Sequence, residues 1–236
     1  MSIADKLITV AENVPKVYDA GKKAEYDAFW NAYQQNGNRT DYQRCFCGSA
    51  WTAETLKPKY DINPTFGGGT AIFQGCGFVG NMKKHLETLG IKLDFSRLVT
   101  LSQAFYQAYY ITELPDIDIS NCINGCAYLF YQCAALTSVK IIISENVAIN
   151  TNSFTGCSEL KELRFDGTIG QSLDLHWSTK LSADSMASII GCLSPTATNV
   201  TLTISETTRE TFKAKFGADT WNAFLKAWSN WTIAYA

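Results

Sequence analysis

The chain has 236 residues, of which 46% are hydrophobic, so it can bury a sizeable core and is not expected to be disordered. Its 20 Lys and Arg and 22 Asp and Glu give a formal net charge of -2, with no basic run suited to successive phosphates, which argues against nucleic acid as a partner. No apolar run approaches the ~20 residues of a membrane span, and the first residues lack the pattern of a secretory signal. We therefore expect synthesis in a cytoplasm and no membrane insertion.

The first residues carry an apolar seam with alternating steps of four and three, as in a heptad pattern. Pro15 divides it into two predicted helices, residues 2–13 and 15–35, because proline is tolerated at the first helical position but not in the interior. We interpret residues 1–37 as a helical arm that assembles copies of the chain, with a trimer favoured; an arm folded back on its own body is the alternative. The predicted assembly interface comprises Ile3, Leu7, Val10, Val14, Val17, Phe29 and Trp30.

Residues 38–72 are rich in Gly, Thr, Asn and Pro and are interpreted as a transition segment. Its triple glycine, residues 67–69, lacks the Lys-Ser/Thr pair of a phosphate-binding loop, so a turn is expected there.

Three segments of the chain then repeat one pattern. Phe105, Phe130 and Phe154 lie 25 and 24 positions apart, and each is followed at plus three by a small residue and at plus six and plus nine by an aliphatic residue. Phe73 begins a degenerate fourth segment. A unit of this size cannot cover its own apolar side, so the segments are predicted to stack, with their Phe rings in one column. Residues 73–180 are therefore predicted to form a short leucine-rich-repeat-like solenoid of the α/β class.

A short strand is predicted after each repeated segment, with apolar residues inward and the alternate residues outward. The outward positions, predicted to lie on one sheet, are Asp116, Asp118, Lys140, Ile142, Arg164, Asp166, Asp174 and His176. Of these, Asp116, Asp118, Lys140, Arg164 and His176 are candidate ligand-binding residues.

Tyr106 and Tyr131 directly follow two of the repeated Phe residues and are predicted to stack near the ~4.8 Å spacing of neighbouring strands. With Tyr109 and other tyrosines nearby, they form a candidate aromatic platform for a glycan. The alternative is that these rings only cover the outside of the core, since tyrosine is often half-buried.

Residues 181–236 no longer repeat and are predicted to form an α/β C-terminal cap. Helices are expected to start at Ser182 and Ser205, a third helix to include Trp221 and Trp228, and strands to lie at residues 200–204 and 231–235.

The sequence does not indicate an enzyme. It has two histidines and no catalytic motif around either, so we assign no catalytic residue and no cofactor. Of the eight cysteines, Cys133 and Cys157 occupy the repeat position held elsewhere by Ala108, which indicates packing, and the remaining cysteine spacings do not suit a metal site.

The strings SNCINGCAYLFYQCAALTSVKI and NSFTGCSELKELRF resemble the BspA-type leucine-rich repeats of bacterial surface proteins and of proteins encoded by bacteriophages. The resemblance covers about residues 73–175 and implies adhesion or host recognition. The opening MSIADKLITVAEN and the C-terminal layout are similar to phage-encoded members that are tail or virion proteins. The expected function is thus a non-enzymatic virion protein, with other tail proteins and a host-surface glycan or protein as partners; a bacterial adhesin and a hydrolase using Cys or Asp are the alternatives.

Overall fold

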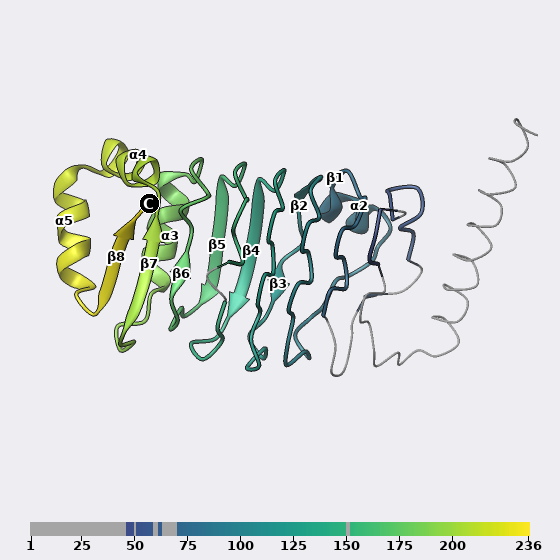
Figure 1. Ribbon diagram of the computed structural model, residues 1–236, viewed down its shortest axis with the longest axis horizontal. Helices are drawn as coiled ribbons and strands as arrows, with labels where there is room; N and C mark the ends of the chain where they lie inside the picture. Colours follow the sequence, from purple (N-terminus) through teal and green to yellow (C-terminus); the bar gives the residue numbers. More distant parts are fainter. Residues whose placement is uncertain (1–45, 50, 59–60, 63–69, 150–151) are drawn as a thin grey trace, which may run out of the picture.

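The computed structural model describes residues 46–49, 51–58, 61–62, 70–149 and 152–236 (Figure 1). The predicted helical arm and its assembly interface, from Ile3 to Trp30, lie outside the described residues, as does part of the transition segment. The helices are α2 (Met82–Thr88), α3 (Ala183–Cys192), α4 (Glu206–Phe216) and α5 (Ala218–Ala227). The strands are β1 (Gly80–Asn81), β2 (Ile111–Glu113), β3 (Ile117–Asp118), β4 (Ser138–Ile143), β5 (Glu162–Gly167), β6 (Leu173–Asp174), β7 (Val200–Ile204) and β8 (Trp231–Tyr235).

The strands form two sheets in which every pairing is parallel. The first sheet has the order β1-β2-β4-β3, with β5 also paired to β4, and the second has the order β6-β7-β8. Figure 1 shows the strands side by side along the long axis, with α3, α4 and α5 gathered toward the C-terminal end. The α/β class is therefore confirmed.

The leucine-rich-repeat-like solenoid with a C-terminal cap is a wrong prediction. It required one strand from each unit in a single continuous sheet, whereas β2 and β3 come from one unit and both pair with β4. Pro115 lies between them and has no N–H to donate, which interrupts the strand. The first sheet ends at β5, because β6 pairs with β7, and the C-terminal residues build a second parallel sheet.

A column of phenylalanine rings runs through the core, as the repeat spacing predicts. The ring centroids of Phe105 and Phe130 are 5.7 Å apart and those of Phe130 and Phe154 are 5.5 Å apart, and all three side chains are at most 1% exposed. Phe73 stacks on Phe105 at 5.2 Å, and Phe46, which the repeat pattern does not reveal, stacks on Phe73 at 5.0 Å. The predicted column is confirmed and is one ring longer at its N-terminal end.

Buried thiols connect neighbouring segments of this column. The Cys133 thiol donates to the carbonyl of Phe105 at 3.0 Å, and the Cys157 thiol donates to the carbonyl of Phe130 at 3.2 Å. Burial raises the pKa of Cys157 to about 12 and raises that of Cys133 well above its ordinary value. Both groups stay protonated at neutral pH, so their predicted packing role is confirmed and includes a hydrogen bond.

The predicted helix starts near the C-terminus are also confirmed. Ser182 caps α3 by accepting from the N–H of Ser185 at 3.1 Å, and Ser205 caps α4 by accepting from the N–H of Thr208 at 3.0 Å. The α3 helix packs against β5, where the hydroxyl of Ser185 accepts from the N–H of Leu163 at 3.1 Å. Among the described residues, no helix has the length and apolar character needed to cross a membrane.

Candidate functional site

The repeated segments have a shared backbone feature two residues after each Phe. Gly75, Gln107, Gln132 and Gly156 occupy this position, with φ angles of 61°, 58°, 57° and 79°. This left-handed conformation costs an ordinary residue about 1–2 kcal/mol but costs glycine almost nothing. The two outer segments therefore use the residue that fits, and the two central segments use glutamine.

Tyrosine rings gather on the same two central segments. The rings of Tyr106 and Tyr131 stack with centroids 4.9 Å apart and an interplanar angle of 9°, which confirms the predicted stacking. Tyr128 stands edge-on to both, 6.3 Å from Tyr106 and 5.6 Å from Tyr131. All three are half-buried, so each ring is held in place by its neighbours while part of it remains accessible.

The two glutamines, each of which directly follows one of the stacked tyrosines in the sequence, form a hydrogen-bonded pair. The Gln107 Nε2 donates to the Gln132 Oε1 at 3.0 Å, and the Tyr109 hydroxyl donates to the same oxygen at 3.4 Å. Gly156 leaves room for this arrangement, since a Cβ there would lie 3.2 Å from the Gln132 Cα and 3.3 Å from its Cγ. We call this site the tyrosine–glutamine surface, and it comprises Tyr106, Gln107, Tyr109, Tyr128, Tyr131 and Gln132.

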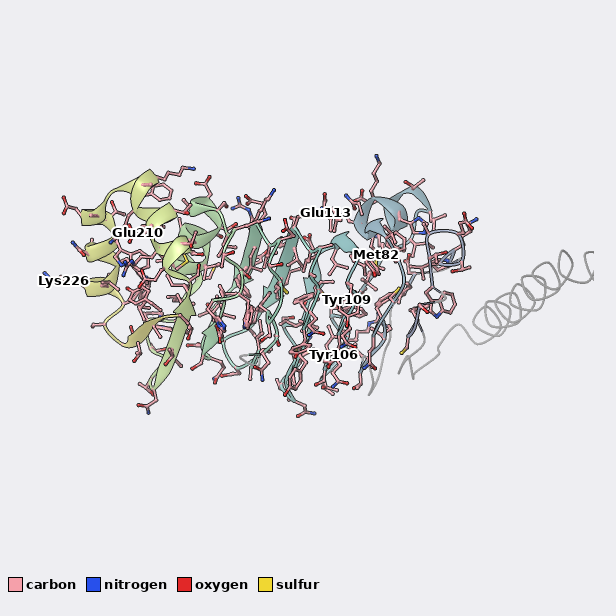
Figure 2. The ribbon with its side chains drawn as sticks, turned by 45° about the horizontal axis from the view of Figure 1, so that its top comes forward. Met82, Tyr106, Tyr109, Glu113, Glu210 and Lys226 are labelled. Atoms are coloured by element: carbon pink, nitrogen blue, oxygen red, sulfur yellow. The ribbon has the colours of Figure 1, made fainter. Side chains whose placement is uncertain are left out.

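The tyrosine–glutamine surface is built from segments without charge. Residues 98–112, 119–139 and 146–158 contain no Asp, Glu, Lys, Arg or His. In Figure 2, Tyr106 and Tyr109 lie in the lower and middle part of the central segments, and Glu113 lies at the upper end of β2. A ligand at this site would therefore meet aromatic rings, amides and hydroxyls.

The sequence prediction included the tyrosines Tyr106, Tyr109 and Tyr131 and missed the two glutamines. A signal for them was present, because the segments that begin at Phe73 and Phe154 carry glycine at the equivalent position. Comparison of that position among the segments would have indicated a left-handed residue, and hence an unusual use of Gln107 and Gln132.

The predicted outward row on the strands has a different character. The Lys140 Nζ lies 3.3 Å from the Asp116 Oδ2 and 3.0 Å from the Asp166 Oδ2, and these hydrogen bonds, first that with Asp166, raise the pKa of Lys140. Arg164 pairs with Glu162 at 3.5 Å, and the Asp118 carboxylate accepts from the hydroxyl of Ser120 at 2.7 Å. These charged groups already have partners in the row or next to it.

An open groove of about 400 Å³ lies between α2 and this row. Its lining includes the carboxylates of Asp116 and Asp118, the side chains of Lys83 and Lys92, and Leu86 and Leu93. The groove brings together two of the candidate residues from the sequence, and both carboxylates already accept the hydrogen bonds described above.

His176 does not belong to this row, which corrects the prediction of a single outward sheet. It follows β6, and β6 pairs with β7 in the second sheet. Its Nδ1 lies 2.6 Å from the Asp174 Oδ1, and its ring lies 5.0 Å from that of Trp177. The strand alternation placed Asp174 and His176 correctly relative to each other but not relative to Lys140 and Arg164.

Within the described ranges, no group of three or more His, Cys, Asp or Glu residues is placed to hold a metal ion. Comparison of the chain with family models, with curated proteins and with solved structures finds no match.

Proposed function

We propose that this protein is a non-enzymatic component of a bacteriophage virion, carried at the tail, that binds a molecule on the host-cell surface. The tyrosine–glutamine surface is the proposed contact site. The observation that carries the proposal is the hydrogen-bonded glutamine pair, which directly follows the two stacked tyrosines in the sequence.

The cost of this arrangement supports a binding role. Gly75 and Gly156 meet the same backbone requirement without strain, so glycine would serve the backbone equally well at Gln107 and Gln132. Strained backbone positions cluster at sites of function, where the side chain is needed despite its cost. Compared with glycine at this position, glutamine adds a side-chain amide to each of the two central segments.

Rigidity supports the same conclusion. Tyr106, Tyr128 and Tyr131 contact one another, and the Gln132 amide is held by Gln107 and Tyr109. Side chains that are already ordered lose little conformational entropy on binding, and tyrosine combines a large apolar area with a polar tip. The surface is thus preorganised for binding in the free protein.

The virion setting is supported by the similarity of the sequence strings to those of phage-encoded tail proteins. In this setting the N-terminal segment, with Ile3, Leu7 and Val10 in its seam, attaches the chain to other tail proteins or to further copies of itself. A homo-oligomer, with a trimer favoured, is proposed and is tested by mass measurement of the purified full chain.

The test uses purified full-length chain and cells of the bacterium that the phage infects. Wild-type protein should bind these cells, and the double variant Tyr106→Ala with Tyr131→Ala should bind at least tenfold more weakly. Trp177→Ala is the matched control, because it removes an aromatic residue that is 48% exposed and that follows β6 of the second sheet, outside the tyrosine–glutamine surface. Equal binding by the double variant would contradict the proposed contact site.

A separate measurement tests whether the protein is part of the virion. Mass spectrometry of purified phage particles should find the chain, and antibody labelling should place it at the tail. Particles that lack the chain altogether would contradict this part of the proposal, whatever the result of the cell-binding measurement.

A further inference from the structure

We infer that the ligand of the tyrosine–glutamine surface is a neutral glycan, bound through adjacent hydroxyl groups at the two glutamine amides and through its C–H groups at the tyrosine rings. This inference rests on the proposed function and specifies the chemical class of its ligand.

The glutamine pair offers hydrogen-bonding groups to a ligand. The Gln132 Oε1 accepts from both Gln107 and Tyr109, which fixes the orientation of both amides. Among the described residues, the Gln132 Nε2 and the Gln107 Oε1 have no hydrogen-bond partner, so the pair offers one donor group and one acceptor group. Two adjacent sugar hydroxyls provide the complementary acceptor and donor.

The tyrosine rings are the apolar part of the site. Tyr106 and Tyr131 form a stacked pair, and the equivalent positions in the neighbouring segments are Gln74 and Thr155, so the paired rings are confined to the two segments that carry the glutamines. Sugar rings present C–H groups on one face and hydroxyls around the edge. Aromatic rings beside a few fixed polar groups match that division, as they do in small-molecule sites generally.

The surface lacks the charged groups that an ionic ligand would need. The segments that build the surface contain no Lys, Arg or His between residues 98 and 112 or between residues 119 and 139. An anionic ligand would therefore lose hydration without gaining a counter-charge. A proline-rich peptide also docks on tyrosines, but proline has no N–H to donate to the Gln107 Oε1. Both alternatives fit the site less well than a neutral glycan.

The test compares treated host cells. Periodate cleaves the bond between two carbons that carry adjacent hydroxyls, so mild periodate oxidation should reduce binding of the wild-type chain at least tenfold. Protease treatment of the cells should leave binding unchanged, and raising the salt concentration should have no effect, because no ion pair is formed.

The matched variant is Gln107→Gly with Gln132→Gly, which keeps the left-handed backbone that Gly75 and Gly156 already adopt. Binding should fall at least tenfold while the far-UV circular dichroism spectrum stays unchanged, and Trp177→Ala should bind as wild type. Full binding by the glycine variant would overturn the role of the amides.

The outcomes separate this inference from the proposed function. If binding requires Tyr106 and Tyr131 but survives periodate and is lost after protease treatment, the ligand is a protein, so the glycan inference fails and the proposed function stands. If the wild-type chain does not bind the cells, the proposed function fails as well.

Discussion

The same stacked segments present two surfaces of opposite character. On the strand row of β4 and its neighbours, Lys140 lies between Asp116 and Asp166, and the charges are paired within the protein. On the tyrosine–glutamine surface there is no charge, and amide groups of Gln107 and Gln132 remain available. The difference shows that an abundance of polar groups is a poor guide to a binding site when those groups already have partners.

The two surfaces also differ in backbone strain. The strand row follows ordinary parallel pairing, with Lys140 opposite Arg164 and Ile142 opposite Asp166. The tyrosine–glutamine surface holds two glutamines at positive φ. The hydrogen-bonding groups left unused at these two glutamines distinguish the proposed site from the structural row.

The largest expected effect comes from the phenylalanine column that lies beneath both surfaces. Phe130 is fully buried between Phe105 and Phe154, so Phe130→Ala should leave a cavity and lower the free energy of unfolding by about 3–5 kcal/mol. Urea denaturation measures this loss. Phe216→Ala, at a residue that is 36% exposed, should cost about 1 kcal/mol or less. Equal losses would show that the column is not the common support of the two surfaces.

The next largest effect is expected from glycine and alanine substitutions, compared between the tyrosine–glutamine surface and the strand row. At Gln107 and Gln132, the double glycine variant should be more stable than the double alanine variant by about 1–2 kcal/mol in total, because glycine avoids the left-handed strain although it adds freedom to the unfolded chain. On β5 the order should reverse, so that Arg164→Gly is less stable than Arg164→Ala. Thermal and urea unfolding measure both pairs, and the same order at both places would contradict the assignment of strain.

The repeat spacing was sufficient to predict the column and the tyrosine stack. A period of 24 or 25 residues brings Phe105 over Phe130 and therefore Tyr106 over Tyr131, since each tyrosine directly follows its phenylalanine. The alternation of apolar residues likewise predicted which side of β4 and β5 is buried. These features depend on local sequence and on one repeated distance.

The division into two sheets could not be predicted in the same way. It depends on the strand with which β6 pairs. That strand is β7, which follows β6 in the sequence only after the helix α3. Gly167, with φ of 119° at the end of β5, marks the place where the first sheet ends, but a single glycine does not specify the next pairing. Long-range pairing of this kind is decided by the packing of whole elements.

A smaller effect concerns the buried thiols and pH. The pKa of Cys157 is raised by burial to about 12 from an ordinary value of 9.0, so the unfolded chain loses this proton at a lower pH than the folded chain does. Its contribution to stability is complete below pH 9 and is lost as the pH rises toward 12. Urea unfolding at about pH 8 and about pH 10.5 should therefore show a smaller alkaline loss for Cys157→Ala than for wild type.

The control for this prediction is the stability at neutral pH. There Cys157→Ala should lose about 1 kcal/mol with the hydrogen bond to Phe130, and Ala108 shows that a methyl group fits the equivalent position. If the free energy of unfolding changed equally with pH in the two proteins, folding would not raise the pKa of the Cys157 thiol.

The smallest effect is expected on the strand row. Lys140→Gln removes both ion pairs of a side chain that is 38% exposed, so the midpoint of thermal unfolding should fall slightly in low salt and match wild type in high salt. Host-cell binding should not change, because Lys140 lies outside the tyrosine–glutamine surface. Weaker binding by this variant would contradict the proposed contact site. It would indicate that the ligand contacts the charged row, where Lys140 is paired with two carboxylates.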